Sequence, residues 1–505
     1  MQWWPEAVVY QIYVRSFTDS DGDGVGDLAG IRSRLGYLEL LGVDALWLTP
    51  FYTSPMADHG YDVADARAVD PVFGDLDTFD ALVTDAHAHG LKVTIDLQLN
   101  HTSADHEWFR AALESPPGSP ERERYHFRAG VGDAAPNNWR SEFGGPAWTR
   151  VRGPDDSDEW YLHLFSSAQP DLNWANPEVW AECEKTVRFW LDRGIDGFRI
   201  GVAHGMSKPE GLPDARVGQD PRFDHPGAHE VHRMIRAVID HFPGRMAAAQ
   251  ICVDDGAAFA RYVRADELHI GLRPRLRDAR FDADAVRAAI ESSLAAVSGT
   301  PSPPSWSISD HDTPRPVTRY GGGRAGVARA RAMALVALAL PGAVYLYNGE
   351  ELGLPDVELP DDALQDPRWE LSGHTDRGRD RCRVPLPWEG GAPGFGFTDG
   401  QPWLPIPEEW ADRVVADQLE DAESTLSLYR RALALRSYHP AFTGWELEWF
   451  GAPEGCLAFR RAGSTLVCAL NTGDDHVPLP PGEVLLASAP LAGDLLPPDT
   501  AVWLA

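Results

Sequence analysis

The chain has 505 residues and a formal net charge of −31 at pH 7, and 43% of its residues are hydrophobic. It is therefore long enough to bury a large core, and its charge argues against nucleic-acid and membrane partners, because an acidic surface is repelled by phosphate groups. The five cysteines are odd in number and lack C-x-x-C spacing, and the sequence has neither a basic leader nor a long apolar span. We therefore expect a cytoplasmic protein, present as a monomer or a homodimer.

Short apolar runs alternate with amphipathic stretches, which predicts parallel strands joined by helices. The runs occupy residues 8–14, 45–50, 92–101, 197–203, 245–251, 267–272, 305–312 and 343–350. Helical periodicity follows most of them, for example over 27–41, 79–89, 177–193, 284–297 and 329–340. Eight such units predict an α/β fold of the (β/α)₈ or TIM-barrel type, with functional groups at the C-terminal strand ends.

Two segments interrupt this alternation. Residues 102–170 are rich in Gly, Pro, Trp and Asn and are too long for an ordinary loop, so we expect an inserted subdomain that covers the barrel mouth. Residues 443–505 alternate apolar and polar side chains between turns, which predicts a C-terminal antiparallel β-sandwich domain. The barrel would then consist of residues 1–101 and 171–442.

An acidic turn precedes the first expected helix. It places carboxylates at alternate positions between glycines, an arrangement that suits hard cations such as Ca²⁺. A solvated acidic turn without metal is the alternative. We expect a structural Ca²⁺ or Mg²⁺ site, with the ligands Asp19, Asp21, Asp23, Val25 and Asp27.

Several short motifs occur at or just after the expected strands. They are Gly60-Tyr61-Asp62, Asn100-His101, Gly197-Phe198-Arg199-Ile200 and His311-Asp312, with Gln169-Pro170-Asp171 and Arg379-Asp380 outside the strands. In this order they resemble the α-amylase family, glycoside hydrolase family 13, and in particular its oligo-1,6-glucosidase and α-glucosidase branch. The acidic turn also resembles the metal loop of that branch.

The resemblance implies a pocket for one terminal glucosyl unit of a small carbohydrate or sugar-derived ligand. In such a pocket Tyr61 would stack under the sugar ring, and Asp62 with Arg383 would hold the 4-hydroxyl side. His101, His311 and Asp312 would bind the 2-, 3- and 6-hydroxyls. Arg199 would orient the group that follows it on the fourth barrel strand.

The resemblance also implies that two catalytic carboxylates are missing. The family's nucleophile position is occupied by Gly201 and its acid/base position by Gln250. Glycine has no side chain and glutamine does not titrate, so neither step of a retaining hydrolysis has its agent. The sequence therefore predicts a non-hydrolytic, carbohydrate-binding pseudoenzyme.

Two other interpretations stay open at this point. A repurposed catalyst would act on a sugar-derived or other small molecule through Asp310, Asp312 or His311, and crowding of two carboxylates would raise the pKa of one. Alternatively, Asp310 only accepts hydrogen bonds from the backbone. The second interpretation is that the chain is an inactivated variant of a retaining α-glucosidase, an enzyme that hydrolyses or transfers glycosidic bonds.

Overall fold

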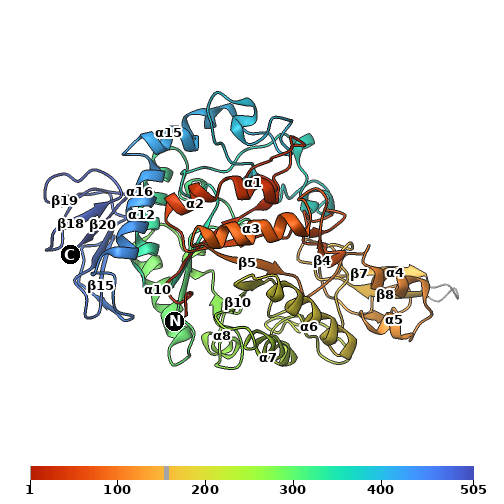
Figure 1. Cartoon of the computed structure of the whole chain (residues 1–505). Helices are drawn as coiled ribbons and strands as arrows, with labels where there is room; N and C mark the ends of the chain where they lie inside the picture. Colours follow the sequence, from red (N-terminus) through yellow and green to blue (C-terminus); the bar gives the residue numbers. More distant parts are fainter. Residues whose placement is uncertain (1, 153–157) are drawn as a thin grey trace.

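The barrel is the centre of the molecule (Figure 1). The computed structural model describes residues 2–152 and 158–505. Eight strands form one sheet in the order β11-β10-β9-β5-β2-β1-β13-β12, and all their pairings are parallel. They are β1 (Val8–Ile12), β2 (Ala45–Leu48), β5 (Lys92–Leu97), β9 (Gly197–Ile200), β10 (Met246–Gln250), β11 (Ile270–Leu272), β12 (Ser305–Ser307) and β13 (Ala343–Tyr347). Each lies within one of the eight expected runs, so the predicted barrel is confirmed.

The two end strands of the sheet nearly close the circle. The hydroxyl of Ser305 on β12 donates to the carbonyl oxygen of Gly271 on β11 at 2.7 Å. Four of the eight barrel strands are buried along their whole length and the other four at all but one residue, as expected for strands with side chains in the barrel on one face and helices on the other. This two-sided burial explains why the sequence shows continuous apolar runs there.

Helices surround the barrel and connect its strands (Figure 1). Asp27 caps the first helix by accepting the N–H of Gly30, and Asp75 caps α3 through Thr78. The expected helix over 27–41 is divided at Arg34 into two. The helices are α1 (Leu28–Ser33), α2 (Leu35–Leu41), α3 (Leu76–Ala88), α6 (Pro177–Asp192), α7 (Gly227–Ile239), α8 (Gly256–Tyr262), α9 (Arg275–Asp278), α10 (Ala283–Val297), α11 (Pro316–Arg319), α12 (Gly323–Ala339), α13 (Pro367–Leu371), α14 (Asp380–Arg383), α15 (Val415–Glu420) and α16 (Thr425–Tyr438).

The segment after β5 has elements and a small core of its own. It contains α4 (Glu107–Glu114), α5 (Pro120–Glu123) and an antiparallel sheet of β6 (Phe127–Arg128), β8 (Asp158–Leu162) and β7 (Trp148–Arg152). Trp139, Trp148 and Leu162 pack together in its interior. A hairpin of β3 (Tyr52–Thr53) and β4 (Asp65–Val69) lies beside it (Figure 1). The domain boundaries remain predictions.

The C-terminal residues form an antiparallel sheet on the opposite side of the barrel from β7 and β8 (Figure 1). Its strands are β14 (Leu447–Trp449), β15 (Cys456–Arg461), β16 (Val467–Asn471), β20 (Thr500–Leu504) and β18 (Val484–Ala487), with a separate pair of β17 (Val477–Pro478) and β19 (Leu495–Leu496). The indole N–H of Trp503 donates to Leu335 of α12 at 3.0 Å, which fixes the sheet to the barrel. Within the described ranges, none of the helices has the length and apolar character of a membrane span.

Candidate functional site

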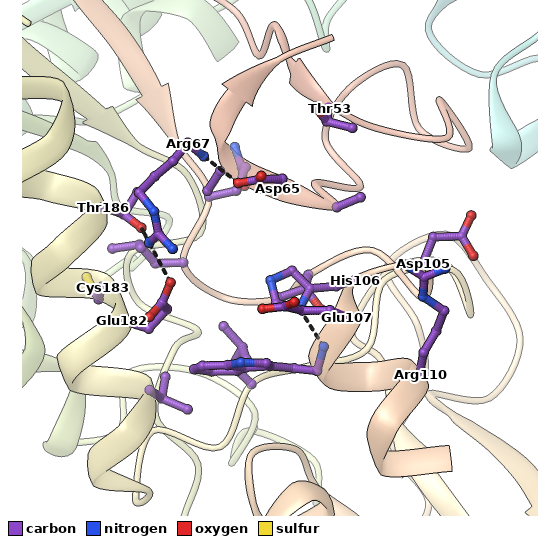
Figure 2. A pocket seen from close by; sticks show the side chains of 18 of the residues that line it. Thr53, Asp65, Arg67, Asp105, His106, Glu107, Arg110, Glu182, Cys183 and Thr186 are labelled. Atoms are coloured by element: carbon purple, nitrogen blue, oxygen red, sulfur yellow. Dashed lines mark hydrogen bonds and ion pairs between the residues drawn. The ribbon is translucent and has the colours of Figure 1, made fainter. Parts of the chain in front are cut away.

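A small pocket of about 80 Å³ opens at the C-terminal ends of the barrel strands. Its walls come from the barrel and from the segment after β5, and its lining residues are Asp58, Tyr61, Gln98, His101, Phe143, Phe165, Gln169, Arg199, Gly201, Val202, Gln250, His311, Asp312 and Arg379. A larger cavity of about 360 Å³ lies elsewhere, beside α4 and α6 (Figure 2). We place the candidate site in the smaller pocket, because functional groups of this fold gather at these strand ends.

Arg199 is the cation at the floor of this pocket. It donates to the carboxylate of Asp96 at 2.9 Å and to the side-chain oxygen of Gln250. Burial alone would lower the pKa of Arg199, but the negative charge of Asp96 outweighs it and holds that pKa above its ordinary value. The guanidinium group is therefore permanently charged and fixed between β5 and β10.

Gly201 follows the last residue of β9, beside Gln250. A Cβ atom at Gly201 would lie 3.1 Å from Nε2 of Gln98 and 3.2 Å from a terminal nitrogen of Arg199. Its φ lies outside the left-handed region, so the backbone does not require glycine at this position. The amide of Gln98 adjoins the space that a side chain would take, and its buried Nε2 has no hydrogen-bond partner among the described residues. Val202 has a φ of 49°, a strained value for a β-branched residue.

Tyr61 and His311 form a neutral wall. The Tyr61 hydroxyl lies 2.7 Å from Nε2 of His311 and donates to Asp96 at 3.0 Å, while Gln11 contacts Nδ1 of His311 at 2.6 Å. Burial lowers the pKa of His311 to about 4 despite the nearby charge of Asp312. His311 is thus uncharged at neutral pH, which suits an exchange of hydrogen bonds with hydroxyl groups.

Asp312 is the most accessible carboxylate of the pocket. It accepts hydrogen bonds from Arg383 at 2.9 Å and from Arg379 at 3.2 Å, and its side chain is 34% exposed. Burial opposes ionisation, but His311, Arg379 and Arg383 outweigh it and hold the pKa of Asp312 well below its ordinary value. Asp312 is therefore an acceptor at neutral pH and not a proton donor.

The structure brings together seven of the residues predicted for the site. Tyr61, His101, Arg199, Gly201, Gln250, His311 and Asp312 all line the pocket. The other lining residues were not among the predicted site residues; they are Asp58, Gln98, Phe143, Phe165, Gln169, Val202 and Arg379. Phe143 and Phe165 come from the segment 102–170, whose irregular sequence gave no signal for individual contacts, whereas Gln169 lies in one of the motifs that carry the family resemblance.

Asp62 and Arg383 do not line the pocket, contrary to expectation. Asp62 is fully buried and accepts the N–H groups of Ala57 and Asp58, each at 2.9 Å, and burial raises its pKa to about 6. Arg383 lies behind Asp312 and also donates to the backbone carbonyl of His311 at 2.9 Å.

A different acid–base pair faces the pocket instead. Asp58 and Arg379 both line it and are joined at 2.7 Å. Asp58 stands four residues before Asp62, and Arg379 four before Arg383, so each expected residue has a neighbour of the same charge. In both cases the pocket is lined by the residue that comes first in the sequence.

Asp310 does not have the raised pKa that a replacement acid would need. It pairs with Arg277 and accepts the N–H of Asp312 at 3.0 Å. Burial works against ionisation, but the Arg277 charge outweighs it, so the pKa of Asp310 lies below its ordinary value. Asp310 is thus a hydrogen-bond acceptor, and its partners are the side chains of Arg277 and Thr313 as well as the backbone.

Three carboxylates of the acidic turn converge. Oxygen atoms of Asp19, Asp21 and Asp27 lie within 4.8 Å of one another, a spacing compatible with ligands 2.3–2.6 Å from one Ca²⁺. Asp23 is not part of this group, and its carboxylate accepts the N–H of Val25 at 2.7 Å. The carboxylates of Asp19, Asp21 and Asp27 therefore fit a hard cation, without the carboxylate of Asp23 that was expected to join them.

Comparison with known proteins gives a consistent picture. The family model "Alpha amylase, catalytic domain" matches residues 11–444. A probable alpha-glucosidase of Rhizobium meliloti (strain 1021) is 37% identical, with 94% of this chain and 90% of that protein covered. The alpha-glucosyl transfer enzyme XgtA has a TM-score of 0.89 at 37% identity, with both chains fully covered. Trehalulose synthase MutB of Pseudomonas mesoacidophila MX-45 has a TM-score of 0.90 at 29% identity, over 99% of this chain and 98% of that one. A MutB variant was solved with its substrate sucrose.

Glu350, which follows β13, provides a test of the electrostatics behind the pocket. It accepts hydrogen bonds from Ser309 and Tyr429, and burial raises its pKa to about 7.

A raised pKa of Glu350 means that the native state favours the protonated form, so this stabilisation is complete below about pH 4.5 and is lost as the pH rises through 7. Relative to Glu350→Gln, the wild-type chain should lose up to about 3 kcal/mol of unfolding free energy over that range. Urea unfolding at several pH values measures this difference. Parallel pH profiles of the two proteins would contradict the prediction, and the exposed Glu409→Gln is the control.

Proposed function

Because this chain belongs to the α-amylase family of glycoside hydrolases, we propose that it is a member that binds a carbohydrate and does not hydrolyse it. The observation that carries the proposal is the pairing of Arg199 with the amide of Gln250 beside the bare backbone of Gly201. Retaining hydrolysis needs two carboxylates about 5–5.5 Å apart at the reacting bond. At both positions that the family resemblance assigns to them, this chain has no carboxylate.

The remaining groups favour recognition of hydroxyl groups. Neutral His311 and the Tyr61 hydroxyl donate or accept, Asp312 accepts, and Arg379 donates. A sugar ring with several hydroxyls needs such a mixture. The repurposed-catalyst alternative has less support, because Asp310 and Asp312 both have lowered pKa values and thus no proton to give at neutral pH.

A structural cation is a second part of the proposal. Asp19, Asp21 and Asp27 would hold Ca²⁺ or Mg²⁺ next to the N-terminus of α1, and none of the three lines the pocket at the barrel mouth. Such an ion would neutralise repulsion among these carboxylates and so stabilise the turn.

Binding without turnover is the first expected result. Calorimetry should detect saturable binding of isomaltose or maltose, and 4-nitrophenyl α-glucoside should be cleaved no faster than in buffer. Asp312→Asn should weaken binding at least about tenfold, because a charged acceptor of sugar hydroxyls is lost. The exposed Asp77→Asn on α3 is the matched control. Ordinary glucosidase turnover, or no binding of any sugar, would refute the proposal.

Restoring the two carboxylates tests why hydrolysis is absent. Gly201→Asp with Gln250→Glu should remain nearly inactive, because the Gln98 amide adjoins the place of the new side chain. Adding Gln98→Val should raise the rate of 4-nitrophenyl α-glucoside cleavage at least about tenfold, equivalent to about 1.4 kcal/mol of barrier. A double variant as active as the triple variant would show that Gln98 does not interfere.

Metal binding is checked by thermal unfolding. Ca²⁺ should raise the Tm of the wild-type chain and a chelator should lower it, because the ion binds only the folded turn. Asp21→Asn should abolish most of this response, whereas Asp23→Asn, whose carboxylate is outside the cluster, should retain it. A Tm independent of Ca²⁺ and Mg²⁺ would remove the cation from the proposal.

A further inference from the structure

A cavity larger than the pocket at the barrel mouth lies beside the barrel. It is a cleft of about 360 Å³ between the β3–β4 hairpin, the start of α4 and the side of α6, which we call the side cleft (Figure 2). Ligand pockets typically have volumes of about 300–1,000 Å³, and the side cleft falls in this range. It shares the lining residue Gln98 with the pocket at the barrel mouth, but its other walls come from β4, α4 and α6.

One wall of the side cleft is rigid. Arg67 of β4 contacts Glu182 of α6 at 2.5 Å and donates to the hydroxyl of Thr186 at 3.1 Å. Burial of Glu182 opposes its ionisation, but the Arg67 charge outweighs it and lowers the pKa of Glu182. This wall therefore presents a fixed donor and a fixed ionised acceptor.

The opposite wall carries His106, Glu107 and Arg110, whose side chains have polar atoms without a hydrogen-bond partner among the described residues (Figure 2). His106 accepts the backbone N–H of Trp108 on Nδ1 at 3.1 Å, and burial lowers the pKa of His106. Its proton must then be on Nε2, which becomes a donor with no partner among the described residues. The side chains of Glu107 and Arg110 likewise have no hydrogen-bond or ion-pair partner within the described ranges.

An aromatic side chain completes the cleft. Trp108 lines it, is only partly buried, and is packed by the Arg124 guanidinium 4.6 Å from the ring centroid. Aromatic rings supply large apolar contact area at low conformational cost, and they pack against the C–H faces of flat ligands. Trp108 therefore adds an apolar surface to a cleft that is otherwise polar.

We propose that the side cleft is a second carbohydrate-binding site, which holds one neutral sugar unit against Trp108. Donors on Arg67, His106 and Arg110 alternate with the acceptors Glu107 and Glu182, and a polyhydroxy ligand uses both kinds. The lining carries four carboxylates, on Asp65, Asp105, Glu107 and Glu182, against the two arginines Arg67 and Arg110, and this excess of negative charge disfavours an anion. This site does not depend on the function proposed for the barrel mouth.

Calorimetric titration of the full chain with isomaltotriose or maltotriose tests the proposal. Trp108→Ala should weaken one binding event of the wild-type chain about tenfold, and a second event is expected if the barrel mouth also binds sugar. Asp312→Asn should weaken only the other. Trp108→Phe should retain most of the affinity, and Trp445→Ala, at an exposed position just before β14, is the control.

Glu107→Gln keeps the test decisive if Trp108→Ala fails to fold, because Glu107 is exposed and its change should weaken the same site. A single site lost with Asp312→Asn, or two sites both insensitive to Trp108→Ala and Glu107→Gln, would overturn the proposal. Binding of choline in place of either sugar at this cleft would assign the cleft to organic cations and overturn it as well.

Discussion

The buried ion pair of Arg199 with Asp96 is the contact around which the barrel mouth is organised. It joins neighbouring strands β9 and β5, and the same guanidinium group reaches Gln250 on β10. Tyr61 is held by the other oxygen of Asp96 and in turn positions His311. Removing Asp96 would leave the buried charge of Arg199 unpaired, which is strongly destabilising. The orientation of the side chains at the floor of the pocket therefore depends on this ion pair.

The charges of the pocket form a pattern that is set at neutral pH. Asp312 is held ionised by two arginines, and His311 is kept neutral by burial. Neither group changes its protonation near pH 7, whereas an acid/base catalyst must do so. The pocket is thus suited to presenting hydrogen-bonding groups and unsuited to transferring protons.

The sequence was sufficient for the architecture, because periodic burial extends over many residues in every strand and helix. It was sufficient for pocket residues on or shortly after a barrel strand, such as Arg199 and His101, whose direction follows from the barrel itself. It was insufficient where two like-charged residues stand four positions apart, as with Asp58 and Asp62 or with Arg379 and Arg383. Side chains that approach from the segment 102–170, such as Phe143 and Phe165, were beyond it, because only the three-dimensional arrangement brings them to the pocket.

The position of Gln98 has a consequence for the history of the chain. Once a long amide adjoins the space above residue 201, a single codon change that returns aspartate there brings a new side chain against an existing one. On the function proposed above, hydrolysis would return more readily when position 98 changes together with position 201 than when position 201 changes alone.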